Sequence, residues 1–330
     1  MSDNKLIAST SPHVSSNAST RRIMLDVVIA LIPSFIAGII FFGLKAVLIV
    51  LLAIFSSFAS EVVFNLCKKV PFKDAINIDL TSIVTGFLIG LSLNANSAWY
   101  LPVLASVFAI VVVKMLFGGT GKNIVNPAIA GRCFVFISFL GNATSNMATN
   151  WIIKDGLTTG ATVLTDMLTT GLHTLTLTNL DLLLGINVAG CIGETCKLAI
   201  LIGFIYLIVR RVVDFKWPLI FVLTAGLFTV ALKGFDFAYF MPTILSGSLL
   251  FVAVFMATDY VTTPNTVCGN VVYFILIGLL TAGLRLACKM EVVTFTVLLM
   301  NFIVPFIDKC IVPKPFGAPK SVAKAKEAKQ

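Results

Sequence analysis

A short, threonine-rich stretch, Thr158-Thr159-Gly160-Ala161-Thr162-Val163-Leu164, interrupts a sequence that is otherwise mostly apolar. Gly160 and Ala161 leave the backbone open enough for an enzyme or a bulky group to reach the hydroxyl of Thr162 from solvent. The chemistry that such a stretch offers is the attachment of a group through that oxygen. The alternative is a plain loop turn, because small residues and threonines are common in loops.

Three charged residues lie in or beside apolar segments, where charges are rare. Arg132 lies near the centre of an apolar segment, and an arginine there costs about 2.5–3.5 kcal/mol on insertion scales. Arg132 therefore needs compensation, either from Glu61 or Asp79 or from an electron-rich cofactor. Asp259 and Glu61 are candidates for carboxylates that couple to a proton or a sodium ion, and both are also compatible with ordinary positions at helix ends.

A glycine-rich stretch, Gly118-Gly119-Thr120-Gly121-Lys122-Asn123, precedes Asn126-Pro127. It is not a phosphate-binding P-loop, because Leu116 and Asn123 stand where that motif needs a glycine and a serine or threonine. Asn126 followed by Pro127 is typical of a helix start. Backbone N–H groups around Gly119 and the side chain of Asn126 could hold a cofactor, or the stretch could be a turn between two helices.

The composition determines the class of protein in which these residues must work. The 330 residues are 58% hydrophobic and 12% charged, with a mean hydropathy of +1.00, whereas soluble domains are about a quarter charged. We predict an all-α, polytopic integral membrane protein in the lipid bilayer with about ten transmembrane helices. The predicted spans are 24–42, 46–66, 80–93, 98–117, 124–140, 197–209, 217–232, 241–257, 271–287 and 292–307.

The predicted spans divide the chain into five parts. These are a leader (1–23), a first membrane half (24–140), a loop (141–196), a second membrane half (197–312) and a polar tail (313–330). Of the 24 lysines and arginines, 17 fall on the side of the two termini and six on the other side, with Arg132 inside a span. This asymmetry predicts that both termini are cytoplasmic and that the loop with Thr162 is external.

The net charge of +9 does not indicate nucleic-acid binding, because the basic residues lie in short loops and a tail. No metal site is predicted either, since the two histidines have no partner at ligand spacing and no two cysteines form a C-x-x-C pair.

A faint internal repeat relates the two membrane halves. The stretch 81–88 in the third span is similar to the stretch 242–249 in the eighth span. Because the two lie an odd number of spans apart, a five-plus-five repeat would be inverted, as in many transporters. Coincidence between two apolar stretches is the alternative.

The threonine-rich stretch resembles the Ser/Thr-Gly-Ala-Thr signature of the NqrB/RnfD family, in which the last threonine is esterified to the phosphate of FMN. Other family landmarks occur in the family's order, namely Ser11-Pro12-His13, the glycine-rich stretch with Asn126-Pro127-Ala128 and Arg132, and Asp259 with Thr263-Pro264 and Gly269. The length and the short tail favour the RnfD branch. One departure is Gly156, which stands where the motif usually has an acidic residue.

The resemblance implies a flavin-carrying electron-transfer subunit of an ion-pumping ferredoxin:NAD oxidoreductase, incomplete as an enzyme on its own. It implies covalent FMN at Thr162, with Gly160 and Ala161 in the motif, and a second, non-covalent flavin (riboflavin) toward the cytoplasmic side. An arginine such as Arg132 beside a flavin would stabilise the charge gained on reduction. The implied partners are the other Rnf subunits and a flavin transferase. The alternative is an inverted-repeat solute channel or transporter without a redox cofactor.

Overall fold

The computed structural model describes residues 19–72, 80–139, 162–169, 171, 178–186 and 188–312, and every regular element in these residues is a helix. The prediction of an all-α protein is confirmed for this part of the chain. The elements before the loop are α1 (Thr20–Phe42), α2 (Leu44–Cys67), α4 (Thr81–Ser92), α5 (Tyr100–Val107), the π-helix η1 (Phe108–Met115) and α6 (Pro127–Ser138).

Two short helices, α8 (Val163–Thr169) and α9 (Asn179–Leu184), belong to the described parts of the loop. The elements after the loop are α10 (Lys197–Val209), α11 (Lys216–Leu232), the 3₁₀-helix η3 (Phe237–Tyr239), α12 (Phe240–Leu245), α13 (Leu249–Phe255), α14 (Val267–Cys288) and α15 (Val293–Cys310). Helical structure therefore lies at each of the ten predicted spans.

Four of these helices, α1, α2, α14 and α15, are long and apolar enough to cross a membrane, and α12 with α13 gives a fifth if the bent pair forms one span. The other apolar helices have 10–17 residues, too short for a lone helix that crosses about 30 Å of hydrocarbon. Ten complete crossings remain a prediction.

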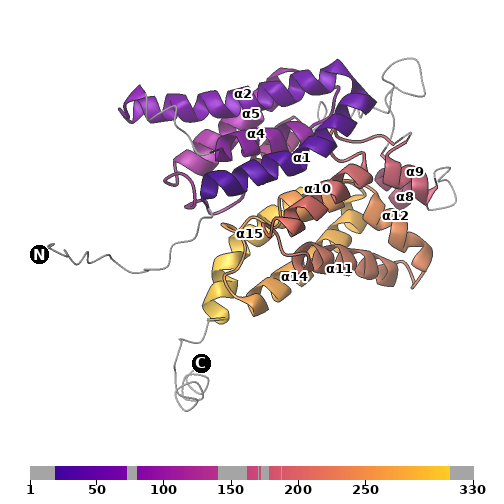
Figure 1. The fold of residues 1–330 in the computed structure, drawn as a ribbon. Coiled ribbons are helices and arrows are strands. Elements are labelled where there is room, and N and C mark those ends of the chain that lie inside the picture. Colours follow the sequence, from indigo (N-terminus) through magenta and orange to yellow (C-terminus); the bar gives the residue numbers. More distant parts are fainter. Residues whose placement is uncertain are drawn as a thin grey trace, which may run out of the picture.

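The helices of each half pack on one another, and the halves meet along two helix pairs (Figure 1). In the first half α2 packs on α4 and α5, and in the second half α11 packs on α12 and α14. The halves meet where α1 contacts α10 and where α6 contacts α15. At the first contact Gly203 lies against α1, and a Cβ there would collide with the carbonyl oxygen of Ala30. Glycine is therefore required for this close approach of two helices.

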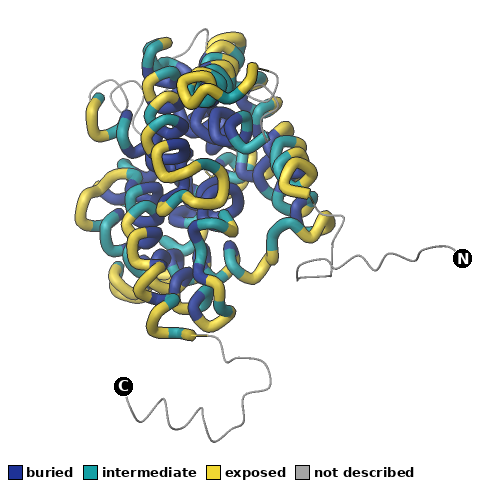
Figure 2. The backbone as a smooth tube through the Cα atoms, turned by 90° about the vertical axis from the view of Figure 1, so that its left-hand side faces the viewer, coloured by how far each residue is buried: buried dark blue, intermediate teal, exposed yellow. Residues whose placement is uncertain are grey.

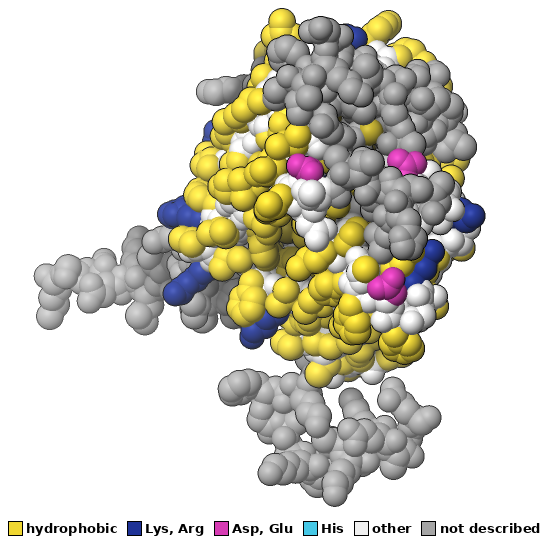
Figure 3. All heavy atoms as spheres, turned by 90° about the vertical axis from the view of Figure 1, so that its right-hand side faces the viewer, with side chains coloured by type: hydrophobic (Ala, Val, Ile, Leu, Met, Phe, Trp, Pro, Cys, Tyr) yellow, Lys and Arg dark blue, Asp and Glu magenta, His cyan; other side chains and the backbone are white. Residues whose placement is uncertain are grey.

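Buried residues form a continuous interior, and exposed residues cover the outside (Figure 2). Many exposed side chains are large and apolar, including Ile40, Leu44 and Phe55, and 84% of Leu44 is exposed. Apolar side chains predominate over charged ones on the described surface at the end that carries α8, α9 and α12 (Figure 3). The exposed apolar side chains along α1 and α2 fit hydrocarbon and would be unusual for a soluble monomer.

A sharp break separates α12 from α13. The axes of the two segments differ by 59°, and Ser246, Gly247 and Ser248 form the connection. Gly247 has a φ of +64°, and a Cβ there would collide with a carboxylate oxygen of Glu291. Only glycine therefore allows both this backbone turn and the approach of the carboxylate. The two stretches related by the sequence repeat do not share this break, because the stretch 81–88 lies within the continuous helix α4.

Candidate functional site

Five buried or partly buried charged residues surround the break between α12 and α13, and we call them the break cluster: Arg132, Glu194, Lys197, Arg285 and Glu291. Arg132, on α6, donates to an oxygen of Glu194 at 2.5 Å, and its other terminal nitrogen lies 3.8 Å from the sulfur of Cys191. Glu61, one of the acidic partners that the sequence offered for Arg132, pairs with Lys114 instead, and Asp79 lies outside the described residues. The partner that the structure shows lies 62 positions further along the chain, in the segment before α10.

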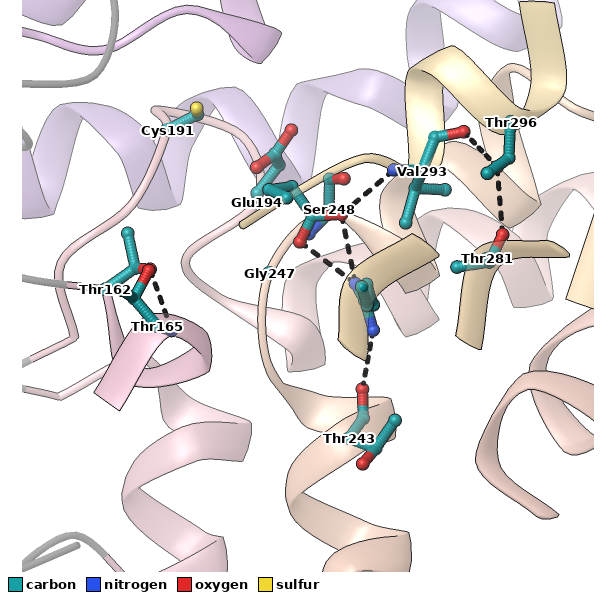
Figure 4. Close-up of polar contacts among 12 residues, drawn as sticks. Thr162, Thr165, Cys191, Glu194, Thr243, Gly247, Ser248, Thr281, Val293 and Thr296 are labelled. Atoms are coloured by element: carbon teal, nitrogen blue, oxygen red, sulfur yellow. Dashed lines mark hydrogen bonds and ion pairs between the residues drawn. The ribbon is translucent and has the colours of Figure 1, made fainter. Parts of the chain in front are cut away.

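The other members of the break cluster hold the backbone of the break itself. Figure 4 shows the break at Thr243, Gly247 and Ser248, with dashed lines for the bonds around it. Arg285 donates to the carboxylate of Glu291 at 2.9 Å and to the carbonyl of Thr243 at 3.1 Å. Glu291 in turn accepts from the backbone N–H of Ser248 at 3.1 Å. Lys197 donates to the carbonyls of Glu194 and Gly247, the second at 2.7 Å. Free carbonyl and N–H groups at an interrupted helix thus find charged partners, as buried backbone groups must.

Thr162 immediately precedes α8 and is partly exposed. Its hydroxyl lies 2.7 Å from the hydroxyl of Thr165 and accepts from the backbone N–H of Thr165 at 3.3 Å. An ester oxygen at this position could still accept both bonds, so the local geometry fits an esterified threonine. Gly160 and Ala161 lie outside the described residues.

The apolar face of α8 fixes the place of Thr162 in the fold. Val163 belongs to a buried cluster that packs against Leu245, and Leu164 belongs to another that packs against Leu286. Leu245 directly precedes the break, and Leu286 directly follows Arg285. The candidate attachment point therefore lies beside the break cluster, and Figure 4 shows Thr162 and Thr165 in the same region as Cys191 and Glu194.

A second site is a cavity between the two halves, at the end of the molecule that carries the N-terminus of α1. The empty space between its walls measures about 860 Å³ when the open mouth is included. Asn126 and Asp259 line it, together with Lys114 and Gly121. Asn123 also lines the cavity and has a buried side-chain oxygen without a partner in the described part of the chain. Gly119, with φ of +95°, shapes the adjoining turn but is not among the lining residues.

Asn126 has two structural roles at the edge of this cavity. Its side-chain oxygen accepts from the N–H of Ala128 at 3.0 Å and caps α6, and its side-chain nitrogen donates to the carbonyl of Met256 at 3.1 Å. The predicted helix start at Asn126-Pro127 is thus confirmed. The second bond joins the first half to the end of α13.

Glu61 is buried behind the cavity and pairs with Lys114 at 2.7 Å. Lys114 lies in η1 and also donates to the hydroxyl of Thr81 at 2.8 Å. Eight-residue π-helical segments are rare and frequently occur at functional sites.

The structure corrects one step of the topology prediction. Lys114 and Lys197 were counted there among the basic residues of the loops, but both ammonium groups are buried.

Asp259 lies in the turn after α13, and burial raises its pKa from 3.8 to about 6 although Val261 and Thr262 donate to it. Because the folded state holds this proton more tightly, ionisation of Asp259 destabilises the fold progressively as the pH rises from about 4 to about 6. The Asp259→Asn variant should therefore be the more stable protein at pH 7, by on the order of 1–3 kcal/mol, and should match the parent near pH 4. Thermal unfolding in detergent across this pH range measures the difference, and a difference that does not change with pH would contradict this assignment.

The predicted site residues thus fall into two groups. Thr162 and Arg132 belong to the region of the break, whereas Asn126 and Asp259 line the cavity and Glu61 lies behind it. Five further site residues were not recognised from the sequence: Lys114, Glu194, Lys197, Arg285 and Glu291. Lys197 carried a signal, since it begins an apolar helix, but its partners come from elements distant in the chain.

A profile of the family described as "NQR2, RnfD, RnfE family" matches residues 7–317. The chain belongs to this family. It is 38% identical over 328 residues to the D subunit of the Na(+)-translocating ferredoxin:NAD(+) oxidoreductase complex of Acetobacterium woodii, covering 99% of this chain and 100% of that protein. It is 31% identical over 320 residues to the D subunit of the proton-translocating ferredoxin:NAD(+) oxidoreductase complex of Clostridium ljungdahlii, covering 94% and 95%.

A third relative, the D subunit of the ion-translocating oxidoreductase complex of Aliivibrio salmonicida, is 33% identical over 350 residues, covering 94% of this chain and 98% of that protein. The family match includes both candidate sites and both membrane halves. The chain is therefore a multi-pass membrane protein of the NQR2, RnfD, RnfE family, and the resemblance recognised in its motifs is confirmed.

Proposed function

We propose that the chain is the D subunit of a ferredoxin:NAD oxidoreductase complex that translocates sodium ions or protons, and that it carries FMN through a phosphoester to Thr162. The observation that supports this most is the partly exposed Thr162 at the start of α8, a helix whose buried side chains pack against Leu245 and Leu286, the neighbours of the break and of Arg285. Each of the three relatives is the D subunit of an ion-translocating oxidoreductase complex. Both coupling ions, sodium and the proton, occur among them.

When bound, a flavin accepts electrons singly or in pairs, and attachment through the phosphate leaves its ring free to react. The residues of the chain supply the attachment point, the charges near it and the exclusion of water by the surrounding apolar helices. Completion of the reaction requires other Rnf subunits, and maturation requires a flavin transferase. In a channel without a redox cofactor, the buried charges of the break cluster would have no redox group to act on.

A second flavin, riboflavin, is proposed for the cavity lined by Asn126 and Asp259. The side-chain oxygen of Asn123, which has no partner in the described part of the chain, offers an acceptor there, and the ion pair of Lys114 with Glu61 lies at the wall of the same cavity. The apolar lining of α1, α4 and α13 residues suits a flat aromatic ring. We also propose that Asp259, or Glu61 in its pair with Lys114, binds the proton or sodium ion whose movement is coupled to electron transfer.

An inverted five-plus-five repeat fits the arrangement of contacts. In each half, the second helix packs on the third and the fourth, and a basic residue from the fourth reaches the start of the third. Lys114 donates to Thr81 at 2.8 Å, and Arg285 donates to the carbonyl of Thr243 at 3.1 Å. These acceptors belong to the two stretches that the sequence repeat relates. Ten spans with broken helices near a central site are typical of such proteins.

Intact mass and in-gel fluorescence test the flavin proposals together. The full chain, produced with a flavin transferase, should show the added mass of FMN and should fluoresce on a denaturing gel. Denaturation should also release free riboflavin, which chromatography identifies. A chain without added mass and without released flavin would favour the channel hypothesis.

Reporter fusions test the proposed orientation, with both termini in the cytoplasm and the protein in the plasma membrane. Arg285, Lys114 and Lys197 are buried, and setting them aside leaves 16 basic residues on the cytoplasmic side and four on the other. Because positive charge in short loops is retained inside, a reporter after Gln330 should be active in the cytoplasm and one after Asn146 outside. Activity of both reporters on one side would exclude this topology.

A further inference from the structure

The break cluster carries one positive charge in excess. Arg132 is paired with Glu194 at 2.5 Å, and Arg285 is paired with Glu291 at 2.9 Å. Lys197 has no carboxylate within ion-pair distance in the described part of the chain, and backbone carbonyls of Glu194 and Gly247 hold its ammonium group. A buried ion without a counter-ion is unfavourable, so the site favours the arrival of a negative charge.

The same region has polar groups that lack partners. The Nε of Arg285 and the hydroxyls of Thr243, Ser246 and Ser248 are buried and make no hydrogen bond to the described part of the chain. A guanidinium N–H can only donate, so at least this group requires an acceptor. Excess positive charge and an unused donor point to the same kind of ligand, a hydrogen-bond acceptor that carries negative charge.

The attachment point for such a ligand lies beside the cluster. Helix α8, which Thr162 precedes, packs on Leu245 and Leu286, the neighbours of Ser246 and Arg285. A group tethered to Thr162 through a phosphate and a flexible chain would therefore start beside residues that adjoin the break. The cluster and the tether come from four different parts of the chain, and only the fold brings them together. Figure 4 shows Thr162 in the same region as Glu194, Gly247 and Ser248.

We propose that the break cluster stabilises the negatively charged, reduced form of the flavin carried by Thr162, and that Lys197, rather than Arg132, is the residue whose charge does so. This inference rests on the proposed attachment of FMN. One electron from the redox chain of the complex enters the ring, no bond forms or breaks, and the ring gains one negative charge. The charge of Arg132 is already neutralised by Glu194, whereas that of Lys197 is not. Lys197 acts only through the electrostatic attraction between its ammonium group and the reduced ring, and it forms no covalent bond.

A redox titration of the purified, flavin-loaded chain tests this. A unit charge about 10 Å from the ring, at an effective dielectric constant of about 20, changes the equilibrium constant for adding one electron roughly tenfold. Lys197→Gln should therefore lower the potential of the first electron by about 59 mV. Glu291→Gln, which removes a negative charge and keeps hydrogen-bonding atoms, should raise the potential. Opposite signs distinguish an electrostatic effect from general damage to the site.

Matched controls are available in the same chain. Lys197→Arg keeps the charge and should keep the parent potential. Lys289→Gln removes an equal charge from an exposed position two residues before Glu291 and should also leave the potential unchanged. Unchanged potentials in both Lys197→Gln and Glu291→Gln, or shifts of the same sign, would overturn the inference.

The parent protein gives a readout that does not depend on these variants folding. If the cluster balances the added charge, no proton accompanies the first electron, and its potential should not depend on pH between about 6 and 7, where Lys197 is charged. A slope of about 59 mV per pH unit would show that a proton neutralises the ring instead, and would also overturn the inference. A chain without covalent flavin on the gel would refute the attachment at Thr162 and is recognised before any titration.

Discussion

Thr162→Ala is expected to abolish both the in-gel fluorescence of the chain and electron transfer through the assembled complex. Alanine removes the oxygen that would form the phosphoester, so the loss should be complete rather than partial. The fold should be retained, because Thr162 is partly exposed and the side chains that anchor α8 are Val163, Leu164, Met167 and Leu168. Loss of the bond to Thr165 should cost about 1 kcal/mol. Intact mass and thermal unfolding measure the two effects separately.

Neighbouring threonines provide the controls for this experiment. Thr162→Ser keeps a hydroxyl in nearly the same place and should retain part of the fluorescence. Thr165→Ala removes the hydroxyl that lies 2.7 Å from that of Thr162 and should leave the flavin attached. Thr158→Ala should also leave it attached. Fluorescence that survives in Thr162→Ala would move the attachment to another residue.

Arg132→Leu is expected to destabilise the chain by about 3–5 kcal/mol, because it leaves the buried carboxylate of Glu194 without its partner. The sequence alone led to a different expectation for stability, that leucine would relieve the cost of inserting a charge and that the variant would assemble but pass electrons poorly, with a shifted flavin potential. The ion pair reverses the expectation for stability, because the variant would keep the buried carboxylate of Glu194 without a counter-ion. Thermal unfolding in detergent gives the comparison.

The double variant Arg132→Leu with Glu194→Gln separates the charge effect from the loss of packing. It removes both charges and leaves the backbone carbonyl of Glu194 in place for Lys197. We expect it to recover most of the stability lost in Arg132→Leu, because replacing a whole buried pair is often nearly neutral. A double variant less stable than Arg132→Leu would show that the interaction between Arg132 and Glu194 is not the source of the effect.

The sequence by itself determined the class of the protein, the positions of its helices and its family. These follow from local properties: apolar stretches form helices in lipid, and Asn126-Pro127 begins one wherever it occurs in such a setting. The motif around Thr162 and the order of the other landmarks were sufficient to recognise the family, because a motif is a property of adjacent residues.

Only the tertiary structure decided which charges meet. Arg132 finds Glu194, Glu61 finds Lys114, and Lys197 reaches Gly247, over separations of 62, 53 and 50 positions. In an apolar interior each buried charge must be compensated, but hydropathy does not indicate by which residue, since any acid on a facing helix would serve. The sequence did not predict the break at Gly247 either, because the similar stretch in α4 continues as a helix. Its position depends on Glu291, Arg285 and Lys197 holding the backbone groups that the interruption leaves free.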